Sequence, residues 1–109
     1  MLTIYTQVKM ENKVYILLML FFCCINTYSQ TADDFIVKGN EKFEKKDYEG
    51  AVLDYTKSIE LNDKDANAYY KRGLSKLFLK EKNSGCSDLN KAMELGSKEA
   101  VEIIKKYCN

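Results

Sequence analysis

The sequence has no histidine, no proline and no tryptophan among its 109 residues. Without histidine, the chain has no Ser–His or Cys–His nucleophile pair and no imidazole metal ligand. It also has no glycine-rich phosphate loop and no nucleophile elbow. We therefore expect no enzymatic activity, no metal and no cofactor. The lack of proline leaves long helices uninterrupted.

Neither sign of charge dominates, because 17 basic side chains accompany 16 acidic ones. No net field therefore points to nucleic acid or to a membrane surface as a partner. Apolar residues make up 46% of the chain and charged residues 30%. This balance is typical of a soluble and largely helical protein, and the length allows one domain at most.

Residues 1–29 differ in composition from the rest of the chain. A run of twelve apolar residues, 14–25, follows Lys13, and small polar residues then precede Gln30. This order is typical of a cleaved signal peptide. The run is too short to span a bilayer, which needs about 20 apolar residues. We expect an exported chain, periplasmic or secreted, that begins near Gln30.

Two other interpretations of this segment stay open. The segment is a retained anchor if no cleavage occurs, and Cys23 or Cys24 carries a lipid if the segment is a lipoprotein signal. The lipid anchor is the weaker of the two, because bulky Phe21 and Phe22 stand where small residues belong. If Met10 is the true start, residues 1–9 are an upstream extension.

The remainder of the chain contains an internal repeat of 34 residues. "DYTKSIELN" at 54–62 and "DLNKAMELG" at 88–96 share Asp, Lys, Glu and Leu at the same places. A fixed period of this length indicates units that bury one face against the next. The matched positions are Phe35 with Tyr69, Gly39 with Gly73, Ala51 with Gly85, Tyr55 with Leu89, Ser58 with Ala92, Ile59 with Met93 and Leu61 with Leu95.

Each copy has the apolar spacing of two helices with a polar break between them. Asp47 in the first break is a candidate helix cap, and Thr31 followed by Asp34 is a capping arrangement before the first helix. Gly39 and Gly73 fall inside predicted helices, where each costs about 1 kcal/mol relative to Ala. A glycine at the same place in both copies indicates a close contact between helices that leaves no room for a side chain. Each copy is therefore predicted to be a helical hairpin.

The residues of this pattern resemble the tetratricopeptide repeat. The resemblance covers residues 32–97, and the second copy departs from the family pattern at Lys82 and Gly85. It implies an all-α fold, an α-α superhelix of two helical hairpins at 32–65 and 66–97. The first copy supplies Phe35, Gly39, Tyr48, Ala51, Tyr55 and Ser58, and the second supplies Tyr69, Gly73, Leu89 and Ala92.

Residues 98–109 are predicted to form a C-terminal capping helix. Ser97 is a candidate N-cap, and apolar residues follow it at helical spacing. Arrays of this kind need a terminal cap to cover the last apolar face.

Cys86 and Cys108 are expected to form a disulfide. They are the two cysteines that remain after signal cleavage, and an even pair in an oxidising compartment is read first as a bond. With a turn at Gly96–Ser97, they stand about ten and eleven residues along opposite arms, which brings them level. Two buried free thiols, or a redox-active or metal-binding pair, are the alternatives; no CxxC motif supports the latter.

The resemblance implies a concave surface that binds peptides, lined by the first helix of each hairpin. Aromatic rings there would anchor a partner protein or peptide, and Asn40 would bond to its backbone. The alternative is that the apolar members simply fill the core. The implied lining residues are Ile36, Asn40, Phe43, Tyr70, Lys71, Leu74 and Phe78.

Some proteins of this family clamp the C-terminal carboxylate of heat-shock chaperones. Asn40, directly after Gly39, matches such a clamp, but Ile36 stands at the place of the expected Lys. Lys71 stands at the place of the expected Asn, and the sequence has no third repeat. We do not expect this clamp, and an exported protein would not meet cytosolic chaperones.

The function that the sequence favours is an exported adaptor or scaffold that binds proteins or peptides. The alternative is a structural domain that assembles with copies of itself, since two repeats leave helix faces free to stack. A concentration-dependent dimer in sedimentation would favour this second interpretation.

Overall fold

The computed structural model describes residue 16 and residues 30–109. The expected signal segment, 1–29, therefore lies outside the described residues except for Ile16. Thr31–Asn109 form one compact unit. No helix in the described part of the chain is both long and apolar enough to cross a membrane.

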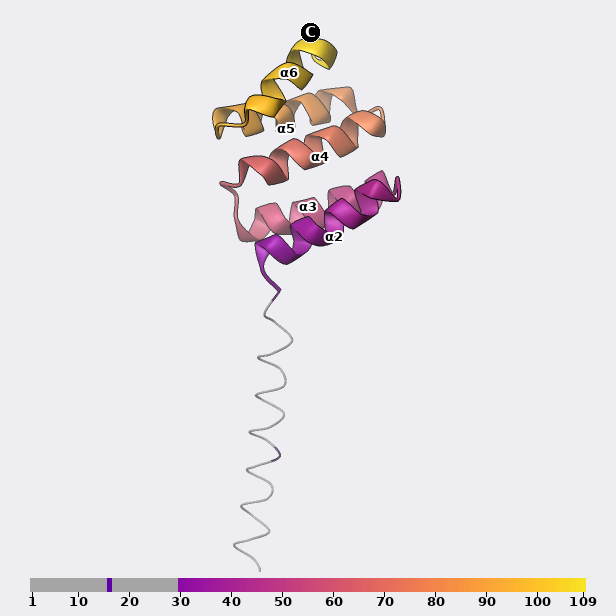
Figure 1. The fold of residues 1–109 in the computed structure, drawn as a ribbon, viewed down its shortest axis with the longest axis vertical. Coiled ribbons are helices and arrows are strands. Elements are labelled where there is room, and N and C mark those ends of the chain that lie inside the picture. Colours follow the sequence, from indigo (N-terminus) through magenta and orange to yellow (C-terminus); the bar gives the residue numbers. More distant parts are fainter. Residues whose placement is uncertain (1–15, 17–29) are drawn as a thin grey trace, which may run out of the picture. The chain divides into compact units, whose positions relative to one another are not determined.

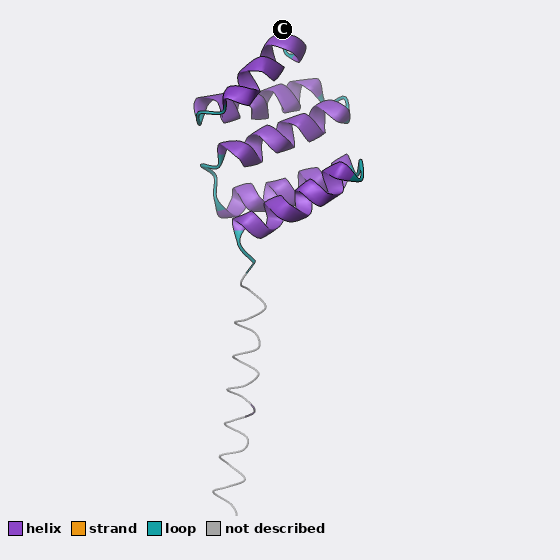
Figure 2. Ribbon diagram, in the orientation of Figure 1, coloured by secondary structure: helices purple, strands orange, loops and turns teal. Residues whose placement is uncertain are grey.

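Five helices follow one another in this unit and are joined by short turns (Figures 1 and 2). Each helix packs against the next one in the chain. Residues 30–109 contain no strand, so the predicted all-α class is confirmed, with two helical hairpins followed by a last helix. The helices are α2 (Ala32–Glu44), α3 (Tyr48–Leu61), α4 (Ala66–Phe78), α5 (Lys82–Glu94) and α6 (Lys98–Tyr107).

Side-chain caps define where four of the five helices begin, and Asp65 is the cap of α4. At the start of α2, the Asp34 N–H donates to Thr31 Oγ1 at 3.3 Å and the Thr31 N–H donates to Asp34 Oδ2 at 2.9 Å. Asp47 caps α3 and Ser97 caps α6, each by accepting a bond from the backbone N–H three residues on. The caps of α2, α3 and α6 are those that the sequence predicts, and each satisfies a free N–H of a first helical turn.

The two hairpin turns have the same backbone geometry. Lys46 lies between α2 and α3 with φ 63°, and Lys80 lies 34 residues later between α4 and α5 with φ 64°. Both are in the left-handed region, which costs a residue with a side chain about 1–2 kcal/mol. Gly96, with φ 101°, makes the turn into α6. The charged run "EKKD" thus contains the end of α2 and the first hairpin turn, whereas "LKEKNS" contains the second turn and the first three residues of α5.

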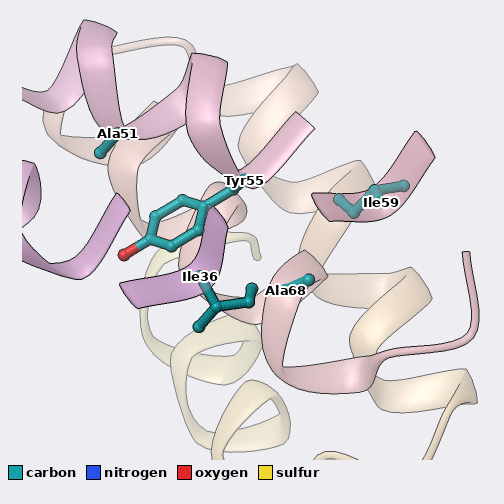
Figure 3. Close-up of a cluster of buried hydrophobic side chains, with 5 residues drawn as sticks. All are labelled: Ile36, Ala51, Tyr55, Ile59 and Ala68. Carbon is teal, nitrogen blue, oxygen red and sulfur yellow. The ribbon is translucent and has the colours of Figure 1, made fainter. Parts of the chain in front are cut away.

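The first core lies within the first hairpin and reaches α4. Tyr55 on α3 is fully buried, with Ile36 of α2 and Ala68 of α4 beside it (Figure 3). The ring occupies the space that Gly39 leaves, because a Cβ at Gly39 would lie 2.5 Å from Tyr55 Cε1. The Tyr55 hydroxyl donates to Asn40 Oδ1 at 2.7 Å. Burial, followed by the nearby carboxylates, raises the pKa of Tyr55 to about 12.

The second core lies between α5 and its neighbours and centres on Leu89, Ala92 and Ala100. Here α4 and α5 approach each other through two glycines. A Cβ on Gly73 would lie 2.9 Å from the Gly85 carbonyl oxygen. The close contact expected at the repeated glycines is therefore confirmed, and in the second hairpin backbone atoms make part of it.

An ion pair recurs at the same place in both hairpins. Lys42 Nζ lies 2.8 Å from Asp54 Oδ2, and 34 residues later Lys76 Nζ lies 2.8 Å from Asp88 Oδ2. Both carboxylates are almost fully buried. The bond to Asp54 raises the pKa of Lys42. A buried carboxylate is costly unless it is paired, so each lysine offsets the cost of its own hairpin's aspartate.

Arg72 links the two hairpins. Its Nε and Nη2 atoms donate to the two oxygens of Asp88, each at 2.7 Å, and its Nη1 donates to Thr56 Oγ1 of α3 at 3.3 Å. A bidentate guanidinium–carboxylate pair fixes the geometry of both partners. The sequence analysis did not identify this network, although the shared Asp of the repeat was its visible signal.

Candidate functional site

An apolar groove of about 610 Å³ lies between the first helices of the hairpins and α6. Its volume lies in the range of ligand-binding clefts, about 300–1,000 Å³. Seven of its eight lining residues are aliphatic or aromatic. We call it the groove; it is lined by Phe43, Tyr70, Leu74, Leu77, Phe78, Lys82, Ile103 and Tyr107.

Two of the lining rings, Phe43 and Phe78, form an aromatic cluster with Tyr48, which lies outside the groove lining. The Tyr48 and Phe78 rings stack with centroids 4.7 Å apart and an interplanar angle of 7°. Phe43 meets both rings edge-on, at 5.3 and 5.7 Å. Offset-stacked and edge-on pairs stabilise by about 0.5–1.5 kcal/mol beyond the area they bury. Phe78 is thus held in place although it is 58% exposed.

The groove also presents accessible aromatic surface to solvent. Phe78 on α4 is 58% exposed and Tyr107 on α6 is 48% exposed. Aromatic side chains of this kind are enriched among the residues that dominate binding energy at protein interfaces. An open apolar hollow with exposed rings is suited to hold the apolar side chains of another molecule.

Lys82 is the charged member of the lining and stands at the start of α5. Its amine makes no ion pair with any residue in 30–109. The groove therefore combines an apolar floor with one accessible cation.

Four of the seven residues that the sequence assigned to the binding surface come together in the groove: Phe43, Tyr70, Leu74 and Phe78. They lie on α2 and α4, the first helices of the two hairpins, where the resemblance placed them.

The other three residues lie elsewhere. Ile36 is 8% exposed and belongs to the first core, because it packs beside Tyr55. Asn40 turns toward the same ring and accepts the hydroxyl hydrogen bond from Tyr55. Lys71 is half-buried and is not part of the groove lining. One turn of α2 thus faces the inside of the hairpin, where the sequence analysis expected it to face a partner.

The sequence analysis missed four lining residues, of which two lie on α6. Ile103 and Tyr107 are four residues apart, so they share one face of that helix. Leu77 and Lys82 flank the turn between α4 and α5. The sequence showed that α6 is amphipathic. Its apolar face was predicted to cover the second hairpin, but not also to line the groove.

A disulfide joins α5 to the end of α6. The Sγ atoms of Cys86 and Cys108 are 2.07 Å apart, and the Cα atoms are 5.8 Å apart. This is the pairing that the sequence analysis favoured. Cys108 is the C-cap residue of α6 and directly follows Tyr107 of the groove. The bond therefore fixes the chain next to a groove residue.

Comparison with known proteins agrees with the arrangement of paired helices. Residues 39–77 match the family model of the TPR repeat. The matched segment is similar to a TPR repeat. It runs from Gly39 in α2 to Leu77 in α4, and so includes the junction between the hairpins. The five helices have the arrangement of a TPR-like superhelix, as the sequence predicts.

One curated relative is Hsp70-Hsp90 organizing protein 1 of Glycine max. The two chains are 39% identical over 64 residues. The alignment covers 59% of this chain but 11% of that protein, so the TPR-like chain spans about a tenth of its relative's length.

Proposed function

We propose that the protein is a protein-interaction module whose groove binds an apolar segment of a partner protein. The observation that carries the proposal is the open groove itself, with seven aliphatic or aromatic lining residues and two exposed rings. The TPR-repeat match supports a protein partner, since repeats of this kind present extended binding surfaces.

The proposal does not extend to Hsp70 or Hsp90, which the name of the relative mentions. Among the expected clamp positions considered above, Asn40 matches, and its side-chain oxygen already accepts a bond from Tyr55. The groove instead favours a ligand with large apolar side chains, because most of its surface is apolar.

The test is selection of a random peptide library on the immobilised full-length chain with its disulfide intact. We expect enrichment of peptides with large aliphatic or aromatic residues. Tyr70→Ala should weaken the binding of a selected peptide by about 1–2 kcal/mol, as measured by titration calorimetry. Leu53→Ala is the matched control, because Leu53 is 64% exposed on α3 and lies outside the groove lining.

The results distinguish a protein that binds no peptide from one that binds peptides outside the groove. If no peptide is enriched, the chain does not bind peptides through any face. If peptides bind and Leu53→Ala weakens them while Tyr70→Ala does not, the binding surface is on the first hairpin and the groove is not the site. Melting curves of both variants show whether an affinity loss reflects unfolding instead.

We further propose that the chain is exported, to the periplasm or the cell exterior. The apolar run at 14–25 supports this, and so does the Cys86–Cys108 bond, because disulfides persist in oxidising compartments. Mass spectrometry of the protein from its native cell should find a chain that begins near Gln30. Soluble protein that still carries the intact N-terminal segment would contradict export through a cleaved signal.

Self-assembly is the second candidate function. Val37 on α2 and Leu53 on α3 are 57% and 64% exposed, so the first hairpin presents large apolar side chains that a second copy could cover. Sedimentation of the oxidised chain over a range of concentrations tests this. A dimer that Leu53→Ala disrupts and Tyr70→Ala leaves intact would favour assembly through the first hairpin.

A further inference from the structure

The wall of the groove on α6 is held by few buried side chains. Among the ten residues of α6, Ala100 in the first turn is buried. Ile103 and Ile104 are partly buried against the second core, and Tyr107 at the end of the helix is 48% exposed. Packing therefore holds the first half of α6 better than its last turn.

The disulfide lies directly after the last turn of α6, and its Cys108 also packs against the second core. It joins Cys108, one residue beyond Tyr107, to Cys86 in the first half of α5. A helix of ten residues is marginal in water without packing, and its ends fray first. The covalent bond therefore supplies a constraint on the last turn of α6 that its few buried contacts do not.

We propose that Cys86 and Cys108 are positioning residues of the groove: their bond holds Ile103 and Tyr107 in place, and binding requires the bond to be closed. The inference rests on the proposed function, since it concerns the same groove. It assigns the bond a role in affinity that is separate from its contribution to the stability of the domain.

The first test needs no ligand and uses amide hydrogen exchange on the full-length chain. The oxidised protein is compared with Cys86→Ser/Cys108→Ser and with protein reduced by dithiothreitol. Reduction transfers two electrons and two protons to the two sulfurs, and dithiothreitol closes to its cyclic disulfide. We expect faster exchange in α6, at residues 103–108, with α2, α3 and α4 little changed.

A non-reducible link is the rescue control. Reduced protein that carries Cys23→Ser and Cys24→Ser acquires, on treatment with diiodomethane, an S–CH₂–S bridge between Cys86 and Cys108, with loss of two equivalents of HI. This form should keep the slow exchange of α6 in the presence of dithiothreitol. Such rescue shows that the link itself matters, and not the reagent.

The second test measures the affinity of a library-selected peptide for the same forms. We expect the double serine variant to bind about tenfold to a hundredfold more weakly, because two groove side chains lose their position. The methylene-bridged protein should bind like the oxidised one. Ile59→Val, in the first core, is the control for lost stability. It should lower the melting temperature without lowering the affinity for the peptide.

Two results would overturn the proposal. One is equal protection of α6 in the oxidised and serine forms, whether or not any peptide binds. The other is a selected peptide that binds the serine variant as tightly as the oxidised protein. If no peptide is selected at all, the proposed function fails, and the exchange experiment still decides whether the bond positions α6.

Discussion

Ser58 and Ser75 are both fully buried, but their hydroxyls have different surroundings. Ser75 Oγ donates to the Lys71 carbonyl oxygen at 2.9 Å. Ser58 Oγ has no hydrogen-bond partner within residues 30–109. The second copy carries Ala92 at the place of Ser58. The first copy of the repeat therefore buries a hydroxyl group at a position where the second copy has the methyl group of Ala92.

Ser58→Ala should raise the free energy of unfolding by about 1 kcal/mol, because it removes an unsatisfied buried hydroxyl. Ser75→Ala, the matched control, should give no gain and up to about 1 kcal/mol of loss. Urea unfolding of the oxidised chain measures both. Equal destabilisation by the two changes would mean that Ser58 has a hydrogen-bond partner after all.

Tyr55 is expected to lower the free energy of unfolding as the pH rises in the alkaline range. Its pKa is about 12 in the folded protein, above the ordinary value near 10. Below pH 10 the phenol is protonated in both states and its contribution to stability is complete. Between pH 10 and 12 the unfolded chain releases the proton first, so stability falls by about 1.4 kcal/mol per pH unit.

Tyr55→Phe should therefore show a shallower loss of stability than the parent chain between about pH 10 and 12. At neutral pH it should be less stable by about 1 kcal/mol, since the bond to Asn40 is lost. Urea unfolding at a series of pH values gives both quantities. Parallel pH profiles for the two proteins would contradict a raised pKa at this position.

At the level of the helices, the repeated glycines lead to a further prediction. Gly73→Ala should destabilise the second hairpin by about 1–3 kcal/mol, despite the better helix propensity of alanine, because the new Cβ would meet the Gly85 carbonyl oxygen. Ser84→Ala, at an exposed position of α5, is the control and should be neutral or slightly stabilising. Thermal unfolding of the oxidised chains compares them. A stable Gly73→Ala variant would show that α5 can move away at little cost.

The helices could be predicted because several local signals agreed. Capping residues Thr31, Asp47 and Ser97 coincide with the observed starts, and the period of 34 repeats the whole pattern. The orientation of α2 was harder to predict. Asn40 lies next to Gly39, which admits the Tyr55 ring, so its side chain turns inward to the hydroxyl. That contact joins residues far apart in sequence, and periodicity does not reveal it.

Contacts between residues far apart in sequence also explain why only part of the groove lining was predicted. Tyr70, Leu74 and Phe78 follow one another at helical spacing on α4, so a single helix face contains them. Ile103 and Tyr107 depend on how α6 crosses α5, which the disulfide and the second core determine together. An amphipathic pattern shows that a helix has an apolar face, but it does not show that part of this face remains open.

At the scale of the whole molecule, the position of Cys108 determines how the described unit transmits a pulling force. Tension applied between Thr31 and Asn109 passes along the backbone to Cys86 and then crosses the disulfide to Cys108, which is 22 residues further on. The intervening chain, including all of α6, carries no load. Stretching of single molecules should therefore give a contour length shorter by about 70–75 Å than that of reduced protein, at about 3.6 Å per residue and less the 5.8 Å between the two Cα atoms. Equal lengths before and after reduction would contradict this path, in which the first hairpin and α4 bear the force while one wall of the groove is mechanically shielded.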